Sequence, residues 1–142
     1  MKTDDDTLRA LLQSCRVVAV VGLSDDPQRP SHGVAKYLQA QGWRIVPVNP
    51  RASLILGEPC FAALEDIPFP VDLVNVFRRT EDVLPIARSA VAIGARGFWQ
   101  QIGVVNAEAD AVARAAGLWS VMDLCIKVEH RRLLGAGAAG TF

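Results

Sequence analysis

Arginine side chains follow three apolar stretches of this 142-residue sequence, at positions where they could bind an anionic ligand. Arg29 comes after the apolar run 17–22, Arg51 after "RIVPVNP", and Arg78 after "VDLVNVF". A guanidinium group can donate two parallel hydrogen bonds to a phosphate or a carboxylate. The spacing therefore raises the question of whether one fold brings these cations to one ligand.

The segment "GLSDDPQRPS" starts like a phosphate-binding turn but lacks the later glycines of the dinucleotide fingerprint. Gly22 permits a tight turn, and the hydroxyls of Ser24 and Ser31 can bind a phosphate. Ser31 is also predicted to cap the following helix, whose N-terminal amides form a ready anion site. Asp25 and Asp26 oppose this interpretation unless they face the solvent. The loop alone leaves phosphate binding open.

The end of the second apolar stretch indicates which nucleotide would fit. NAD-binding units place an acidic residue there for the ribose hydroxyls, whereas this sequence has Asn49, Pro50 and Arg51. An arginine suits a phosphorylated ribose. NAD is therefore disfavoured, and NADP and coenzyme A both stay open, as does a surface turn with a solvated arginine.

Residues after the next two stretches are further candidates to line a pocket. Phe77 and Arg78 end "VDLVNVF", and pairing of Arg78 and Arg79 with the acids at 81–82 would leave at most one arginine free. In "GFWQQIGVVN", Gln100 offers an amide and Gly103 permits close backbone approach. Trp99 is predicted to be a core residue.

Catalytic groups are scarce. The two histidines, His32 and His130, have no metal-ligand spacing, and neither HExxH nor CxxC occurs, so no metal site is predicted. Cys125 follows the last apolar stretch and is the one weak candidate for a catalytic nucleophile, although most free cysteines are packing residues. The sequence favours a binding domain over an enzyme.

The elements that must position these residues alternate between strand and helix along the chain. This pattern predicts a single α/β domain, a Rossmann-like, doubly wound parallel sheet of about five or six strands with helices on both faces. Ligands bind such sheets at the carboxyl ends of the strands, where the strand order reverses. We expect the domain to cover residues 1–134. Residues 135–142, "GAGAAGTF", are expected to be a flexible tail. The expected strands are 16–22, 43–50, 71–77, 95–100 and 118–124, with a short one near Cys60 and Phe61.

The composition excludes several functional classes. The formal net charge is zero, so neither nucleic acid nor an anionic membrane is expected as a partner. No apolar run approaches the ~20 residues of a membrane span, and the acidic start is unlike a secretion signal. Three cysteines without a CxxC pair suit a reducing cytoplasm.

Six segments in their order along the chain resemble a known family, the small stand-alone bacterial and archaeal CoA-binding proteins. They are "GLSDDPQRPSHGVAKYL", "RIVPVNP", "ILGEPCFAALEDIP", "VDLVNVFRR", "GFWQQIGVVN" and "DLCIKVEHRRL". The likeness runs from about Leu8 to Leu133. The family is also similar in fold to the nucleotide-binding domain of the succinyl-CoA synthetase α subunit, whose chemistry should not be transferred because its phosphohistidine segment is missing here.

The resemblance implies coenzyme A, free or as an acyl-CoA, as the ligand. It places the ADP diphosphate near Gly22, Leu23, Ser24, Arg29 and Ser31. It places the adenosine and its 3′-phosphate against Asn49, Pro50 and Arg51, and lines the rest of the groove with Phe77, Arg78 and Gln100.

The leading hypothesis is thus a cytoplasmic CoA-binding carrier, sensor or regulator, as a monomer or a homodimer. One alternative is an NADP-dependent reductase or an acyl-CoA-using transferase with Cys125 as the nucleophile. Another is an interaction module in which the segment "IKVEHRRLL" forms a surface for an unidentified protein partner or a second copy.

Overall fold

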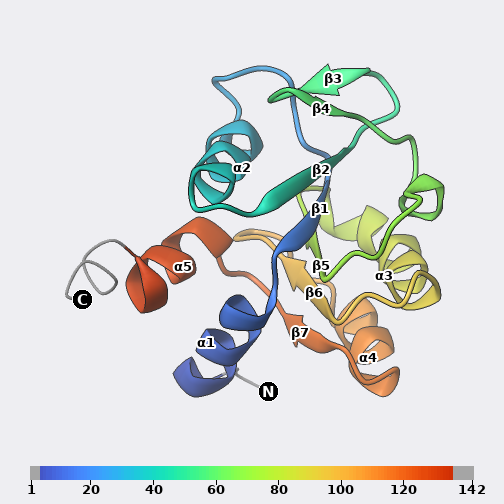
Figure 1. The fold of residues 1–142 in the computed structure, drawn as a ribbon. Coiled ribbons are helices and arrows are strands. Elements are labelled where there is room, and N and C mark those ends of the chain that lie inside the picture. The colour runs from blue at the N-terminus through green and yellow to red at the C-terminus, as the bar shows by residue number, and fades with distance from the viewer. Residues whose placement is uncertain (1–3, 136–142) are drawn as a thin grey trace.

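The computed structural model describes residues 4–135, and its centre is a five-stranded parallel sheet (Figure 1). The strand order is β2-β1-β5-β6-β7, and every neighbouring pair is parallel. The predicted α/β class is confirmed, with five strands in the main sheet. Their bounds are β1 Val17–Val21, β2 Arg44–Val48, β5 Leu73–Val76, β6 Gly97–Gln100 and β7 Trp119–Val121.

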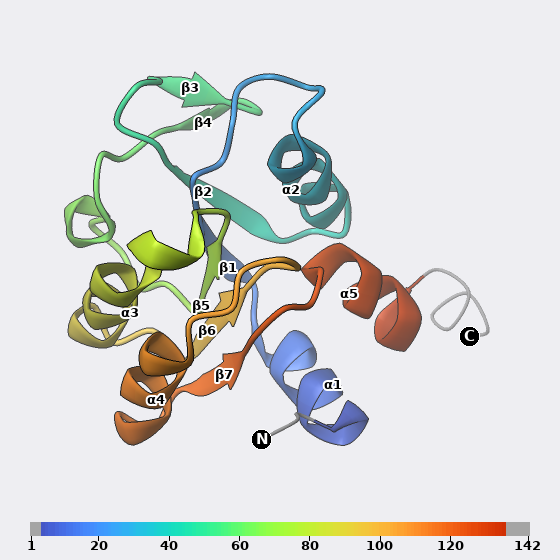
Figure 2. The same ribbon diagram turned by 180° about the vertical axis from the view of Figure 1, so that it is seen from behind.

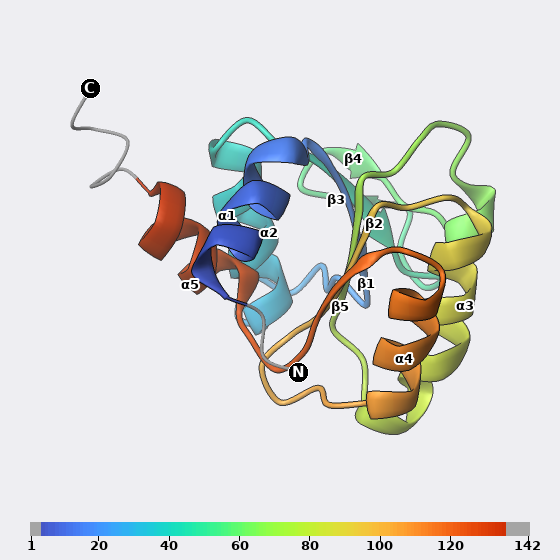
Figure 3. The ribbon, with the colours of Figure 1, turned by 90° about the horizontal axis from the view of Figure 1, so that it is seen from below.

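Helices cover both faces of the sheet, as the alternating pattern predicted. Figure 3 shows α1, α2 and α5 on one side of the strands and α3 and α4 on the other, and Figure 2 shows the same layers from behind. Two separate hydrophobic clusters fill the spaces between these layers. The helices are α1 Asp5–Ser14, α2 Pro30–Ala40, α3 Val83–Ala92, α4 Ala107–Ala115 and α5 Ile126–Leu134.

Strand β1 shows why apolar residues on both faces indicate a central strand. Val18 and Val20 belong to the cluster under α1, α2 and α5, whereas Ala19 and Val21 belong to the opposite cluster. Successive side chains of a strand point to opposite faces, so a strand covered on both sides needs an unbroken apolar run. Pro47 is tolerated because β2 is an edge strand of the main sheet.

The turn-rich stretch after β2 forms a small hairpin instead of the strand predicted near Cys60 and Phe61. Strands β3 Leu54–Ile55 and β4 Glu58–Pro59 pair antiparallel. Phe61 forms only an isolated bridge to Val48. A 3-10 turn, η1 Leu64–Asp66, then leads towards β5.

Local signals fix the starts of the helices on the α3–α4 side. A 3-10 turn, η2 Thr80–Asp82, precedes α3, and Pro85 lies in the first turn of that helix, where its missing N–H does no harm. Asn106 is the N-cap of α4, and its side chain accepts a hydrogen bond from the amide of Ala109.

The C-terminal helix α5 packs one face against the rest of the chain. Ile126, His130 and Leu133 are buried, and His130 Nδ1 lies 2.9 Å from the hydroxyl of Tyr37 on α2. Arg132 binds both carboxylate oxygens of Asp5 on α1. One face of α5 is thus covered within the chain, whereas Val128 and Arg131 are exposed, and the hypothesis of a partner surface there stays a prediction. Beyond Gly135, the predicted flexible tail lies outside the described residues.

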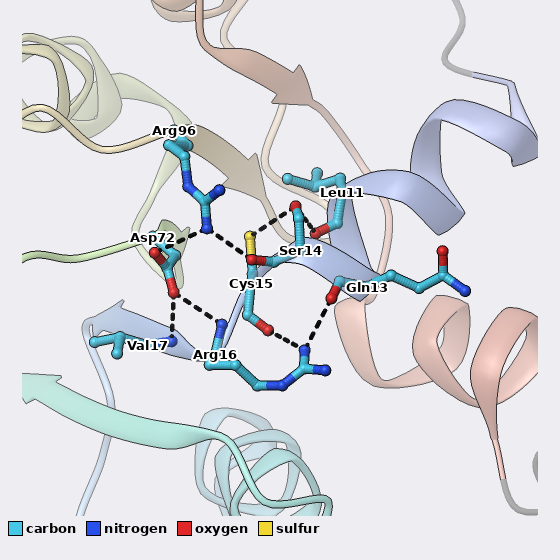
Figure 4. A network of polar contacts seen from close by, with 8 residues as sticks. All are labelled: Leu11, Gln13, Ser14, Cys15, Arg16, Val17, Asp72 and Arg96. Carbon is cyan, nitrogen blue, oxygen red and sulfur yellow. Dashed lines mark hydrogen bonds and ion pairs between the residues drawn. The ribbon is translucent and has the colours of Figure 1, made fainter.

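The amino ends of the strands are joined by a network of paired charges, drawn in Figure 4. Asp72 accepts hydrogen bonds from the backbone amides of Arg16 and Val17 at 2.8 and 2.9 Å, and Arg96 lies 3.0 Å from its other oxygen. Burial alone raises the pKa of Asp72, but these donors outweigh it, so the pKa lies below its ordinary value. The network ties β1, β5 and β6 together.

Among residues 4–135, none of the helices combines the length and the apolar character that crossing a membrane requires.

Candidate ligand-binding site

A pocket of about 860 Å³ opens at the carboxyl ends of the main-sheet strands. It spans the place where the strand order reverses, between β1 and β5, which is where open parallel sheets bind ligands. Nine of the twelve predicted binding residues line it, together with Cys125. The nine are Gly22, Ser24, Arg29, Ser31, Asn49, Pro50, Arg51, Phe77 and Arg78.

Gly22 holds two pocket loops close together. Its φ is +88°, and a Cβ atom added there would collide with the carbonyl oxygen of Phe77 and approach the Arg78 side chain. Its amide donates to the carbonyl of Val48 at 3.0 Å. Only glycine therefore fits where the loops after β1, β2 and β5 meet.

The loop between Gly22 and α2 is ordered by its own side chains. The Ser31 hydroxyl accepts a hydrogen bond from the Ser24 amide at 3.0 Å, and the Ser24 hydroxyl accepts one from the Asp26 amide. Asp25 and Asp26 are exposed and do not line the pocket. The objection that they would repel an anion is thereby weakened.

The prediction that Ser31 caps α2 was wrong. The helix begins at Pro30, and Arg29 is its N-cap residue, without a side-chain capping bond. Proline fits the first helical position because it has the required φ and needs no N–H partner there. The Ser31 hydroxyl fixes the Ser24 amide instead.

Asn49 fastens the loop after β2 to the loop after β1. Its Nδ2 donates to the carbonyl of Leu23 at 2.9 Å, and its Oδ1 accepts from the Arg51 amide at 2.8 Å. The side chain of Leu23 is fully buried and does not line the pocket. Asn49 thus positions Arg51, and Leu23 contributes only its backbone.

Four arginines line the pocket, and one of them has an acidic partner. Arg79 forms an ion pair with Asp82, with 3.5 Å between Nε and Oδ2. Within residues 4–135, Arg29, Arg51 and Arg78 form no ion pair and are exposed. The pairing foreseen at residues 78–82 does leave Arg78 free, so this end of the pocket carries an uncompensated positive charge.

The structure places Gln101, not Gln100, at the pocket. Gln100 is fully buried, and its side-chain amide exchanges two hydrogen bonds with the backbone of Asn106. Adjacent residues of a strand face opposite sides, so Gln100 points with Phe98 towards α4, while Gln101 follows Trp99 towards α5. Trp99 is a core residue, as predicted.

Gly103 also lies outside the pocket lining. Its amide donates to Oδ1 of Asp123 at 2.7 Å, so it joins the loop after β6 to the loop after β7. Asp123 itself adopts a φ of +62°, a left-handed conformation that asparagine and aspartate tolerate better than most residues.

Sequence reasoning missed seven lining residues. Helical spacing could have found Pro30 and Val34, which share a face of α2 with Ser31. The other five lie in the loops after β5 and β6, which were expected to face the ligand, but which of their side chains reach the pocket depends on how those loops fold. The seven are Pro30, Val34, Arg79, Asp82, Gln101, Ile102 and Val104.

The pocket therefore changes character along the sheet. Over β2, β1 and β5 it carries arginines and hydroxyls, which suit phosphate groups. Over β6 and β7 it carries the neutral amide of Gln101, the thiol of Cys125 and the aliphatic Ile102 and Val104. Such a lining can accommodate an elongated ligand with one anionic end and one neutral end.

Comparison with known proteins gives a family match over most of the chain. A family model described as the CoA binding domain matches residues 16–131, which include every main-sheet strand and all the pocket-lining residues. The chain is 44% identical over 123 residues to YneT of Bacillus subtilis (strain 168), covering 87% of this chain and 91% of that protein.

Two solved structures are similar to this fold over nearly their whole length. A hypothetical protein from Pyrococcus horikoshii OT3 superposes with a TM-score of 0.91 at 34% identity, and 94% of each chain is covered. A protein from Thermus thermophilus gives 0.88 at 37% identity, covering 93% of this chain and 100% of that one.

Proposed function

This chain belongs to the family of CoA-binding domains, and we propose that it binds coenzyme A in the pocket at the carboxyl ends of its strands. In this proposal it acts as a carrier, sensor or regulator that responds to free CoA or an acyl-CoA, and binding is its function.

The observation that carries the proposal is the convergence of Arg29, Arg51 and Arg78, which come from three different loops. Coenzyme A presents a diphosphate and a 3′-phosphate at its nucleotide end. Charge-assisted hydrogen bonds from arginine to phosphate are among the stronger polar contacts in proteins. Three exposed cations that have no acidic partner within the described part of the chain supply the charge that such a ligand needs.

The residues at the end of β2 fit a phosphorylated ribose better than a free diol. Asn49 and Pro50 lead to Arg51, and none of the residues described by the structure places a carboxylate in this part of the pocket. A diol would lack the acidic acceptor that NAD-binding domains provide. The donors present there suit the 3′-phosphate of coenzyme A.

The length and polarity of the pocket support one orientation of the ligand. Four strand spacings of about 4.8 Å separate β2 from β7, or ~19 Å in all. The nucleotide would lie over β2, β1 and β5, and the neutral pantetheine arm would extend over β6 and β7 towards Cys125. Gln101 offers an amide to the amides of that arm.

A role without catalysis is supported by the acid–base groups at the site. Among the described residues that line the pocket, Asp82 is the one carboxylate, and it is paired with Arg79. Neither His32 nor His130 lines the pocket, and His130 is buried against Tyr37. General acid–base catalysis needs a free group within reach of the ligand.

Isothermal titration with coenzyme A, dephospho-CoA, adenosine 3′,5′-bisphosphate and NADP tests the proposal. We expect coenzyme A to bind at least about tenfold more tightly than dephospho-CoA, since one charged hydrogen-bonding group contributes about 1.5–3 kcal/mol. Adenosine 3′,5′-bisphosphate should bind more weakly than coenzyme A because it lacks the arm. Equal affinity for coenzyme A and dephospho-CoA would overturn the role of the arginines, and tighter binding of NADP would favour a reductase.

A further inference from the structure

We propose that Cys125 is a modification site at which this protein forms a reversible mixed disulfide with coenzyme A. The proposal rests on the proposed function, because the arginine end of the pocket must deliver the thiol end of the ligand to β7. It adds a covalent, redox-dependent step that binding alone does not include.

Gln101 provides an observation that points to a ligand beside Cys125. Its side chain lines the pocket although the residue is only 3% exposed. Its Oε1 accepts hydrogen bonds from the Ile126 amide at 2.9 Å and from Nδ2 of Asn75 at 3.1 Å. These two donors fix the orientation of the amide, with the oxygen held by protein groups.

The Nε2 group of Gln101 has no hydrogen-bond partner within the described part of the chain. Since Oε1 is held by protein groups and the residue lines the pocket, the two N–H donors face the pocket. The nitrogen is accessible from the pocket, so an acceptor on a bound ligand can take its hydrogen bonds. The carbonyl of a pantetheine amide is such an acceptor, and it lies a few bonds from the thiol.

Cys125 is held in place next to this amide by contacts between the loops after β6 and β7. The peptide N–H that follows it, on Ile126, is the one bound by Gln101. The carbonyl that precedes it, on Leu124, accepts a hydrogen bond of 2.7 Å from Nε1 of Trp99. Asp123 accepts from the Gly103 amide. The half-buried thiol is therefore fixed at the neutral end of the pocket.

The other two cysteines lie in different surroundings and serve as internal controls. Cys15 is fully buried between α1 and β1, and burial raises its pKa to about 11. Cys60 does not line the pocket, and burial together with the charge of Asp25 raises its pKa. Neither thiol is placed to meet the ligand.

The chemical step is thiol–disulfide exchange with the disulfide form of coenzyme A. The Cys125 thiolate attacks one sulfur of that disulfide, its S–S bond breaks, and a new S–S bond joins Cys125 to one CoA unit. The second CoA unit leaves as a thiolate and takes up the proton that Cys125 released. Cys125 is oxidised, the departing CoA is reduced, and a small thiol reverses the reaction.

Intact-protein mass spectrometry after incubation with CoA disulfide tests this step. We expect one adduct, with the mass of coenzyme A less two hydrogens, that disappears on treatment with dithiothreitol. At ~10 µM reagent the reaction should be about 100-fold faster than with glutathione disulfide, because a bound disulfide has an effective concentration in the millimolar range. Adenosine 3′,5′-bisphosphate should slow it by competition.

Matched variants separate this proposal from the proposed function. Cys125→Ser should form no adduct, whereas Cys60→Ser should still form it, and titration of the wild type reports CoA binding separately. If the wild type binds coenzyme A but Cys125 reacts no faster with CoA disulfide than with glutathione disulfide, the modification site is refuted and the binding function stands. If the wild type does not bind coenzyme A, both proposals fail.

Discussion

Charged side chains are arranged differently at the two ends of the parallel strands, called here the amino edge and the carboxyl edge of the sheet. At the amino ends of the strands, Asp72 receives two backbone amides and the guanidinium of Arg96 (Figure 4). At the carboxyl ends, Arg29, Arg51 and Arg78 line a pocket without an acidic partner within residues 4–135.

This difference indicates that the charged groups at the amino edge stabilise the fold, whereas those at the carboxyl edge serve ligand binding. A carboxylate surrounded by donors stabilises the fold because its hydrogen bonds are already made. Cations gathered without acids repel one another and contribute little to folding, but they can all bind an anionic ligand. Substitutions at the two edges should therefore affect different measurements.

Gly22→Ala should give the largest effect, because Gly22 joins the carboxyl-edge loops to one another. The added Cβ meets the Phe77 carbonyl and occupies a left-handed conformation, which alone costs about 1–2 kcal/mol. We expect the free energy of unfolding to fall by more than about 2 kcal/mol. CoA binding should also be lost; urea denaturation and titration measure the two effects.

Gly33→Ala is the matched control for that variant. Gly33 lies in α2, and an added Cβ would have no atom within 4 Å. Alanine should stabilise the helix by about 0.5–1 kcal/mol and leave CoA binding unchanged. Equal losses in the two variants would show that Gly22 has no special steric role.

Replacing one unpaired arginine by alanine should weaken binding without destabilising the protein. For Arg51→Ala or Arg78→Ala we expect CoA affinity to fall about 10- to 100-fold, from the loss of charge-assisted hydrogen bonds. The urea midpoint should stay the same or rise. Arg88→Ala, an exposed arginine on α3 away from the pocket, should change neither quantity. A large loss of stability in Arg51→Ala or Arg78→Ala would contradict the inference that these arginines serve binding and not folding.

Asp72→Ala should destabilise the protein without weakening CoA binding. Without the carboxylate, the amides of Arg16 and Val17 lose their acceptor, and the free energy of unfolding should fall by about 1–3 kcal/mol. Because the pKa of Asp72 is lowered in the folded state, its contribution is present above its ordinary pKa of 3.8 and is lost as the pH falls through the folded value.

Acid denaturation of the wild type and Asp72→Ala measures that dependence. The stability difference between the two proteins should be constant near neutral pH and should shrink below pH 3.8. CoA affinity at neutral pH should be the same for both. A loss of affinity would show that the amino edge also shapes the pocket.

Asp82→Asn should give the smallest effect, because it adds an unpaired cation to the pocket instead of removing one. It removes the acid that pairs with Arg79, leaving one more free cation at the carboxyl edge. We expect coenzyme A to bind more tightly by about 0.5 kcal/mol, because both side chains are exposed to solvent. The gain should disappear at high salt. Glu81→Gln, an exposed neighbour outside the pocket lining, is the control; an equal gain there would indicate only a general charge effect.

Much of this architecture could be predicted from the sequence because its causes are local. The unbroken apolar run at 17–21 indicates a strand buried on both faces, and Asn106 is a good N-cap in any context. Arg51 and Arg78 closely follow strands, and Arg29 ends the loop after the first strand, which placed all three at the carboxyl ends of a parallel sheet. Such signals depend on residue type and spacing, and they give the fold class and the loops that face the ligand.

The tertiary structure decided which neighbouring side chain reaches the pocket. Gln100 and Gln101 are the same residue type one position apart, yet one is bound to Asn106 and the other lies beside Cys125. Gln100 ends β6 and Gln101 follows it on the opposite side of the sheet, and packing against α4 and α5 decides which side each one faces. Likewise, Asn49 and Gly22 are positioning residues because of partners on other loops, which no local pattern contains.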